Sequence, residues 1–294
     1  RIEFNEQRTA TFREHLQFIA ANYFNDPAYY RINGRPVVYI YLTRTFAGDY
    51  KNAISAARQD VAEMGFDIFL IGDEVYWGSP NFTRIAALDG ITAYNMHGPH
   101  EYNGYPMDTR FFEKVAEKYT AFRNIANLTN TAFIPKIMPG FNDRGVRLSA
   151  DHYVIPSQVH PDSNHTSTFE HYSHLAEAFI DPNLNALCIT SFNEWHEDTQ
   201  IEPTIMTDAT SFDVSSEQVY TKGYDYTGYG MAYLEIIEEL FTDKYVKVDE
   251  KRGVGQPTDI LLSNFPNPFN NVTEIQFRLK QRENIVISIY DISG

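Results

Sequence analysis

The sequence has a single cysteine and lacks any hydrophobic run long enough to cross a membrane. Cys188 cannot form an intrachain disulfide, and because it lies in an apolar stretch we expect a buried structural thiol rather than a nucleophile. A membrane-spanning helix needs about 18 to 20 consecutive apolar residues, so the sequence predicts no membrane span. No signal peptide precedes Arg1, and we expect the natural N-terminus to lie upstream.

Positive charge is also scarce. The chain has 24 Lys and Arg against 39 Asp and Glu, which gives a formal net charge of -15. Nucleic acid binding requires clustered basic residues, so we expect no nucleic acid partner. No glycine-rich loop follows any predicted strand, which argues against a nucleotide-binding Rossmann domain.

The sequence does contain a regular alternation of amphipathic helices and apolar strands. Helical spacing of apolar residues predicts five helices, over Glu6–Phe24, Tyr50–Met64 (closed by Gly65 as a cap), Thr109–Ala126, Ser167–Ile180 and Met231–Phe241. Apolar runs predict five strands, over Val37–Leu42, Asp67–Ile71, Ile91–Tyr94, Ala132–Met138 and Leu187–Ile189. Strands separated by helices form parallel sheets through right-handed crossovers. A doubly wound sheet and a (β/α)8 barrel both satisfy this alternation.

Polar and aromatic residues at the C-terminal ends of the strands favour the barrel, whose catalytic face lies at those ends. These residues are Tyr41 and Arg44, then Asp73, Glu74 and Trp77, then Tyr94, Asn95 and His97, then Asn142, Asp143 and Arg144, and finally Glu194 to Glu197. The predicted fold class is therefore α/β, a TIM-type barrel lacking its N-terminal strands, with about three βα units expected upstream of Arg1.

The most informative stretch is 186–203, ALCITSFNEWHEDTQIEP, where an apolar strand ends in carboxylates and aromatics. Glu194 and Glu197 are three residues apart beside Trp195 and His196. Glycosyl transfer needs one carboxyl group as an acid, another as a base or nucleophile, and a flat apolar surface for a sugar ring. The alternative interpretation is a solvated loop with a surface Glu/His pair.

SFNEWHEDTQIEP closely resembles the signature of glycoside hydrolase family 99, the endo-α-mannosidase and endo-α-mannanase family. Weaker support comes from HLQFIAANYFNDPAYYRINGRPVVYIY, ITAYNM and MAYLEIIEELF. The resemblance covers residues 1–245. It implies a (β/α)8 barrel that cuts inside α-mannose chains with retention of configuration and without a metal or cofactor.

The resemblance also implies the chemistry. Glu194 is the expected base that deprotonates the sugar 2-hydroxyl, which then attacks the anomeric carbon to form a 1,2-anhydro sugar. Glu197 is the expected general acid and base. Substrate-assisted hydrolases of this kind are known exceptions to the usual two-carboxylate scheme. The family pattern usually has Gly where this chain has Asp198, which adds charge and removes backbone freedom.

We expect further substrate contacts at four neighbouring positions. Trp195 can stack on a sugar or pack against the barrel wall and orient the carboxylates. His196 can bond a substrate hydroxyl or serve as a structural donor. Tyr94 and Asn95 can contact substrate, with the Tyr94 hydroxyl bonding Glu194 or the ring, or can pack under the loop. Outside these four, we expect Asp73 and Glu74 to act either as subsite residues or as helix-cap and salt-bridge partners, and Glu202 as a loop anchor.

The composition changes after the last helix. Residues 246–258 predict a linker, and 259–294 predict the start of a small β-sandwich, with period-two strands around Ile275 and Ile287. LSNFPNPFNNVTEIQF and ISIYDISG resemble the C-terminal sorting domain of the bacterial type IX secretion pathway, most specifically at Pro266 to Asn270. That resemblance implies the type IX secretion machinery as a partner and a secreted or cell-surface location.

We therefore expect a secreted, retaining, endo-acting hydrolase of α-mannan or mannose-rich glycans, acting on a polysaccharide or oligosaccharide substrate. Two alternatives remain at this stage. One is a family 99-like hydrolase of another α-linked polysaccharide, and the other is a non-catalytic glycan-binding barrel.

Overall fold

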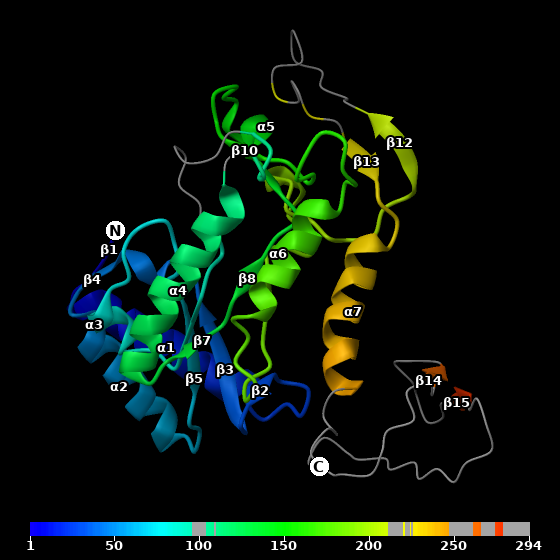
Figure 1. The fold of residues 1–294 in the computed structure, drawn as a ribbon. Coiled ribbons are helices and arrows are strands. Elements are labelled where there is room, and N and C mark those ends of the chain that lie inside the picture. Colours follow the sequence, from blue (N-terminus) through cyan, green and yellow to red (C-terminus); the bar gives the residue numbers. More distant parts are fainter. Residues whose placement is uncertain are drawn as a thin grey trace. The chain divides into compact units, whose positions relative to one another are not determined.

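The computed structural model describes residues 1–95, 104–108, 110–210, 220, 224, 226–246, 261–265 and 274–278. The chain divides into two compact units, Arg1–Thr242 and Asp243–Gly294. The first unit carries the helices and the main sheet, in a mixed α/β arrangement (Figure 1).

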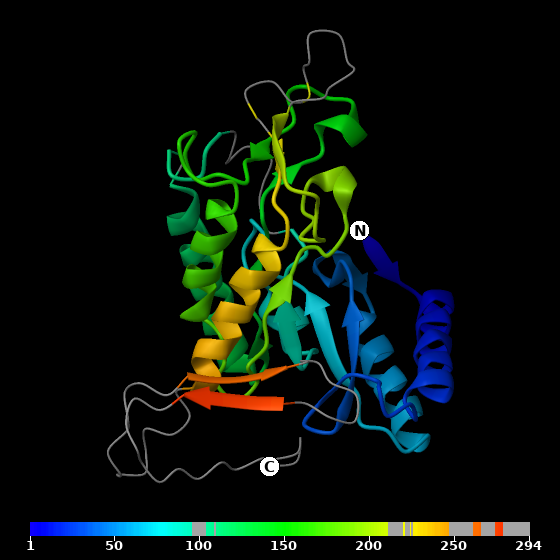
Figure 2. The ribbon, with the colours of Figure 1, turned by 90° about the vertical axis from the view of Figure 1, so that its right-hand side faces the viewer.

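The main sheet has the strand order β2-β3-β5-β6-β7. Its members are β2 (Arg31–Ile32), β3 (Arg35–Ile40), β5 (Phe69–Asp73), β6 (Gly90–Thr92) and β7 (Ala132–Phe133). The last four are parallel to one another, and β2 is antiparallel to β3. Figure 2 shows β3 and β5 side by side with their arrowheads at the same edge.

Two short strands continue the sheet beyond β7. β8 (Lys136–Ile137) pairs in parallel with β11 (Cys188–Ile189). Pro135 separates β7 from β8 because proline has no N–H to donate to a neighbouring strand. The Pro135 carbonyl still accepts the Cys188 N–H at 2.9 Å. All five predicted strands are therefore confirmed, as neighbours in chain order, and they form a curled half-barrel.

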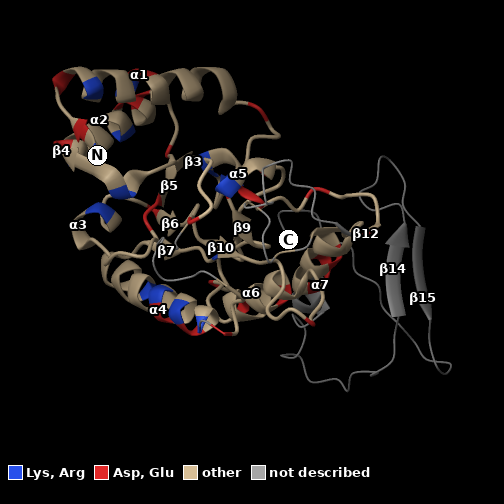
Figure 3. Cartoon of the chain, turned by 90° about the horizontal axis from the view of Figure 1, so that it is seen from above, with Lys and Arg blue, Asp and Glu red and all other residues tan. Residues whose placement is uncertain are grey.

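The helices cover the outside of the half-barrel, and Figure 3 shows α2, α3, α4 and α6 following one another around strands β3 to β7. The five predicted helices are confirmed, with small shifts at their ends. The helices are α1 (Glu6–Tyr23), α2 (Tyr50–Glu63), α3 (Phe82–Ile85), α4 (Phe111–Thr129), α5 (Arg144–Arg147), α6 (Ser167–Glu177) and α7 (Ala232–Val246).

Local chemistry explains several helix ends. The Asn5 side chain accepts the Arg8 N–H at 2.9 Å and begins α1, as an N-cap asparagine does. The predicted cap at Gly65 is confirmed, since this residue has φ +93° and directly follows Met64, the C-cap of α2. α4 runs three residues past the predicted end. It ends at Thr129 because Asn130 takes the left-handed conformation (φ 55°), and the Asn130 N–H donates to the Ala126 carbonyl.

Between α4, α6 and the sheet lies the main core. Phe111, Tyr119, Phe122 and Tyr172 are fully buried, and the Tyr119 ring packs edge-on against Phe133 of β7 at 5.4 Å. Burying one such side chain contributes roughly 1.5–3 kcal/mol. This packing holds the helices against the strands whose C-terminal ends carry the polar residues.

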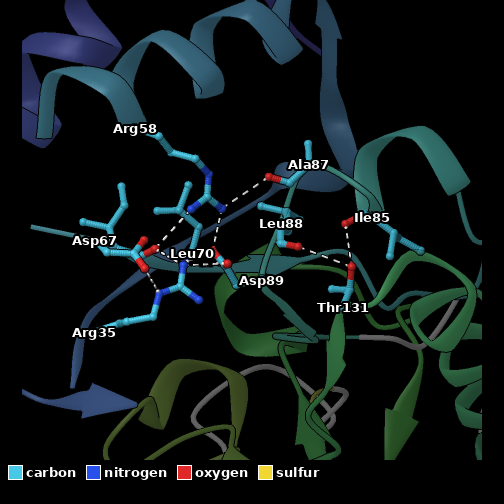
Figure 4. Close-up of polar contacts among 10 residues, drawn as sticks. Arg35, Arg58, Asp67, Leu70, Ile85, Ala87, Leu88, Asp89 and Thr131 are labelled. Atoms are coloured by element: carbon cyan, nitrogen blue, oxygen red, sulfur yellow. Dashed lines mark hydrogen bonds and ion pairs between the residues drawn. The ribbon is translucent and has the colours of Figure 1, made fainter. Parts of the chain in front are cut away.

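At the opposite, N-terminal edge of the sheet, Arg35 and Arg58 converge on Asp89 (Figure 4). The Leu70 N–H also donates to Asp89, at 2.8 Å. Burial opposes ionisation of Asp89, but the Leu70 N–H and the two guanidinium groups outweigh it and lower the pKa of this carboxyl. In barrels this edge contributes stability rather than chemistry.

The first unit contains three further strand pairs. β1 (Ile2–Phe4) pairs with β4 (Phe46–Gly48), β9 (Phe141–Asn142) with β10 (Val154–Ile155), and β12 (Thr207–Thr210) with β13 (Tyr226–Gly228). Two single-turn 3-10 helices, η1 (Thr43–Thr45) and η2 (Trp195–Glu197), follow β3 and β11. Within the described ranges, no helix combines the length and apolar character needed to cross a bilayer.

The second unit contains an antiparallel pair, β14 (Leu261–Phe265) and β15 (Glu274–Arg278), in register from Leu261↔Arg278 to Phe265↔Glu274. The start of the predicted linker, Val246, is the last residue of α7. The rest of the linker, the PNPFN segment at 266–270 and the strand predicted around Ile287 lie outside the described residues. The β-sandwich therefore stays a prediction.

Candidate active site

The loop after β11 is closed on itself by backbone hydrogen bonds. The Ser191 N–H donates to the Thr199 carbonyl at 2.7 Å, and the Ile201 N–H donates back to the Ser191 carbonyl at 3.1 Å. The Thr190 hydroxyl donates to the Tyr94 carbonyl at 2.9 Å, which ties the loop to the end of β6. These bonds fix the turn η2, which places both predicted catalytic residues at the C-terminal end of the sheet.

Glu194 begins this turn. Its N–H donates to the Ser191 hydroxyl at 2.8 Å, and its carboxylate accepts the His196 N–H at 3.1 Å. The side chain is 38% exposed, which leaves it open to a substrate. His196 Nδ1 lies 3.3 Å from Glu194 Oε1, but the imidazole is 82% exposed and turns toward solvent.

Glu197 ends the turn and is half-buried. Its carboxylate accepts the Tyr94 hydroxyl at 2.9 Å. Burial, followed by this bond, raises the pKa of Tyr94, so the phenol keeps its proton and remains a donor. The Tyr41 ring meets the Tyr94 ring edge-on at 5.4 Å. We expected the Tyr94 hydroxyl to bond Glu194 or the substrate ring, and its partner in the protein is Glu197 instead of Glu194.

Asp73 holds Tyr94 in place. Its side chain is fully buried, and its two oxygens accept the N–H groups of Leu42 at 3.1 Å and Tyr94 at 3.0 Å. The Arg44 guanidinium pairs with the same carboxylate. The salt-bridge reading of Asp73 is therefore the one observed, and the residue joins the ends of β3 and β6.

Glu74 is also a buried ion-pair partner rather than a lining residue. Both of its oxygens accept from Arg84 Nε at 3.1 Å. Burial raises the pKa of Glu74 although Arg84 opposes the shift.

Trp195 is fixed at one edge of its ring, and its stacking on a sugar stays a prediction. Its indole N–H donates to the Glu202 carboxylate at 3.0 Å, while the residue is 49% exposed. The ring is thus held by its edge and still offers apolar surface. Glu202 acts as the expected loop anchor through this bond.

Asn95 follows Tyr94 beyond the end of β6. Its amide donates to the Tyr153 hydroxyl at 3.0 Å. Burial is the main cause that raises the pKa of Tyr153 to about 12. The structure thereby adds Tyr153, from the segment before β10, to the residues around Asn95.

The sequence analysis missed Lys136, because this residue reads as one polar interruption of an apolar strand. It is 1% exposed and lies on β8, with its ammonium 5.6 Å from the centre of the Tyr172 ring. Burial lowers the pKa of Lys136 to about 7, while the carboxylates of Asp73 and Glu197 oppose this shift. A buried amine therefore lies within electrostatic reach of Glu197. This proximity depends on which strands are neighbours in the sheet, and the sequence alone does not show that Lys136 lies near Glu197.

Metal binding has no clear site in the part of the chain that the structure covers. Among the described residues, no group of three or more His, Cys, Asp or Glu side chains is arranged to hold a metal ion.

Comparison with known proteins gives the family. The sequence profile described as Glycosyl hydrolase family 99 matches residues 1–245. The chain belongs to glycosyl hydrolase family 99. It is 26% identical over 203 residues to a human glycoprotein endo-alpha-1,2-mannosidase-like protein, covering 66% of this chain and 40% of the human one. It is likewise 26% identical over 202 residues to a Xenopus laevis glycoprotein endo-alpha-1,2-mannosidase, covering 66% and 41%. The chain thus spans about two fifths of the length of these relatives.

Solved structures share the fold with this family 99 chain. A glycoside hydrolase-like protein matches with a TM-score of 0.63 at 22% identity, over 81% of this chain and 62% of that one. A GH99 endo-alpha-mannosidase from Bacteroides thetaiotaomicron matches with a TM-score of 0.54 at 21% identity, over 83% and 66%. The half-barrel is thus similar to part of a larger fold.

The departure from the family 99 pattern at Asp198 leaves the turn intact. Asp198 adopts the left-handed conformation (φ 54°, ψ 39°), which glycine takes without strain. Burial raises the pKa of its carboxyl from 3.8 to about 6, although bonds from Gln200 and Tyr226 oppose the shift. The chain therefore carries a partly buried acid where glycine would leave space.

The bond between Tyr94 and Glu197 supplies a testable expectation. A hydrogen bond to a charged group contributes about 1.5–3 kcal/mol, so Tyr94→Phe should lower kcat by roughly 10- to 100-fold while KM changes little. The phenylalanine ring keeps the contact with Tyr41. Tyr30→Phe, at a residue that is 62% exposed, is the matched control and should have wild-type kinetics. If Tyr94→Phe had the kcat of the wild type, Tyr94 would have no role in catalysis.

Proposed function

We propose that this protein is an endo-acting α-mannosidase that hydrolyses α-mannosidic linkages in α-mannan or mannose-rich glycans. The observation that carries the proposal is the pair Glu194 and Glu197 on one turn at the C-terminal end of β11, with Glu197 bonded to the Tyr94 hydroxyl. The family and the names of the human and Xenopus relatives support the substrate class.

The mechanism assigns one role to each carboxylate. Glu194 takes the proton of the 2-hydroxyl of the sugar, and the 2-oxygen attacks the anomeric carbon as the glycosidic bond breaks. Glu197 gives its proton to the departing oxygen. A 1,2-anhydro sugar results, and Glu197 then takes a proton from the water that opens it at the anomeric carbon, while Glu194 returns its proton to the 2-oxygen. Two displacements at one carbon give net retention.

The surrounding residues support these roles. The half-exposed Glu194 can reach a substrate hydroxyl, and the phenol of Tyr94 orients the Glu197 carboxylate from the sheet. Trp195 offers an apolar surface of the kind that sugar rings stack on. Asn95 and His196 provide polar groups at the margins of the same face.

Product analysis tests the proposal. The protein is incubated with yeast-type α-mannan, and released oligosaccharides are separated while their anomeric form is followed by NMR. Oligosaccharides released with the α configuration support the proposal, and release of β products contradicts retention. If the protein cleaved another α-linked polysaccharide and not mannan, the proposed substrate would be wrong. Binding of mannan without cleavage would favour a non-catalytic glycan-binding barrel.

The location forms a separate proposal. We propose that residues 259–294 belong to a type IX sorting domain that directs export to the cell surface or medium. Supporting it are the PNPFN sequence and the hairpin strands that flank it, β14 before Pro266 and β15 after Asn271. Deleting these residues in a host with a type IX pathway should retain the protein inside the cell, and unchanged export would refute the assignment.

A further inference from the structure

A cavity of about 200 Å³ lies beside the turn that carries the two catalytic glutamates. Its lining includes Trp195, Asp198, Gln200, Tyr226, Tyr229 and Tyr233. Of the described residues, neither Glu194 nor Glu197 lines it, so it is distinct from the carboxylate face. A protein cavity of about 150 Å³ can hold a benzene-sized guest, which means that this one has room for a small organic molecule.

The polar lining of the cavity combines the Asp198 carboxylate and the Gln200 amide with the His165 imidazole and the hydroxyls of Ser157, Thr204, Tyr226 and Thr227. The Gln200 amide nitrogen donates to Asp198 Oδ1 at 3.2 Å. Gln200 itself is 9% exposed, and its Oε1 has no hydrogen-bond partner among the described residues. Buried polar atoms are normally satisfied, so an acceptor left open beside a carboxylate favours a ligand that brings donors.

The tyrosines offer ring surface rather than free hydroxyls. The Tyr229 hydroxyl donates to the Glu202 carbonyl at 2.7 Å, and the Tyr233 hydroxyl donates to the His165 carbonyl at 3.4 Å. Their rings lie 4.5 Å apart at 61°. Because aromatic faces attract cations, an aromatic wall next to a carboxylate is suited to a positively charged guest.

We propose that this cavity binds a small organic ammonium ion. The Asp198 carboxylate is its counter-ion, Gln200 Oε1 accepts one of its N–H groups, and the tyrosine rings contact its alkyl part. An ammonium brings donors and no acceptor, which matches these groups better than a hydroxyl does. The net charge of -15 also raises the local concentration of cations. Since Asp198 follows Glu197 in the chain, an occupied cavity braces the catalytic turn from behind.

Calorimetry with ethylammonium chloride tests this proposal, with ethanol as the neutral analogue and NaCl to match ionic strength. At pH 8 we expect binding of ethylammonium and none of ethanol. Binding should weaken at least tenfold in Asp198→Asn, which keeps the size of the side chain and removes its charge. It should disappear in Thr227→Phe, which fills the cavity from β13. Glu197→Gln should bind as the wild type does.

Three results would overturn the proposal. The first is no heat with ethylammonium in the wild type, and the second is equal binding by the wild type and Asp198→Asn. The third is loss of binding in Glu197→Gln alone, which would move the amine to the catalytic face. Far-UV circular dichroism confirms the fold of each variant, and either Asp198→Asn or Thr227→Phe suffices to locate the site if the other does not fold.

Discussion

Glu197→Gln should lower kcat/KM on α-mannan by about 10²- to 10⁴-fold, the range that a positioned acid–base group contributes. The amide keeps the size of the side chain and its bond to the Tyr94 hydroxyl, but it can neither give a proton to the departing oxygen nor take one from water. A substrate with a good leaving group needs no proton from the enzyme, so cleavage of an aryl α-mannoside should be less impaired.

Glu194→Gln should cause a loss of similar size with a different signature. The base acts on the substrate 2-hydroxyl, so a better leaving group should not rescue this variant. A substrate with a 2-O-methyl group should be inert to the wild type for the same reason. The two losses should not add in the double variant, because both residues serve one transition state.

Steady-state kinetics and a matched control make this comparison sharp. Glu177→Gln changes an exposed glutamate at the end of α6 and should leave kcat/KM unchanged. If Glu197→Gln or Glu194→Gln stayed within tenfold of the wild type, the chemistry would have to reside elsewhere. Rapid cleavage of the 2-O-methyl substrate would exclude the 1,2-anhydro route.

Asp198→Gly should stabilise the protein at pH 8 by up to about 3 kcal/mol. Burial raises the pKa of Asp198 from its ordinary 3.8 to about 6, and each unit corresponds to about 1.4 kcal/mol. The fold therefore favours the protonated acid. Stability is lost as the pH rises from about 4 through 6, and the full cost remains above that pH. Glycine removes the ionised group and also relieves the left-handed backbone.

Urea unfolding at pH 8 and pH 4 measures this effect. The gain should be large at pH 8 and small at pH 4, where Asp198 is protonated in the folded chain. Asp198→Asn should reproduce most of the gain, because it is neutral and asparagine tolerates the left-handed region. Asp162→Asn, at a side chain that is 93% exposed, should change nothing. An equal gain at both pH values, or a loss at pH 8, would contradict the role assigned to burial.

The sequence was sufficient for the five strands and the five longer helices of the first unit and for the catalytic turn. Apolar periodicity found the strands and helices because each buries one face against its neighbours. The carboxylates of the turn were found because two glutamates, a tryptophan and a histidine occupy four consecutive positions, Glu194 to Glu197. Apolar periodicity and the clustering of functional residues can both be recognised within short stretches of sequence.

The contacts between strands could not be read in this way. Tyr94 and Glu197 are 103 positions apart, and only the curvature of the sheet brings the phenol to that carboxylate. Asp73 could be expected at a strand end, but its bonds to Leu42 and Tyr94 depend on which strands are neighbours. Lys136 shows the same limit, because its burial follows from packing by α6 and not from the strand pattern.

The anchoring of Tyr94 has a consequence for engineering. The Tyr94 N–H donates to Asp73 and the Tyr94 carbonyl accepts from the Thr190 hydroxyl. The backbone of Tyr94 is therefore fixed on both sides by residues that lie outside the loop after β11. Residues between Phe192 and Pro203 other than Glu194 and Glu197 can therefore be varied without displacing the Tyr94 backbone. Libraries aimed at new glycan preferences are best confined to those positions, with Asp73, Tyr94, Thr190, Glu194 and Glu197 kept unchanged.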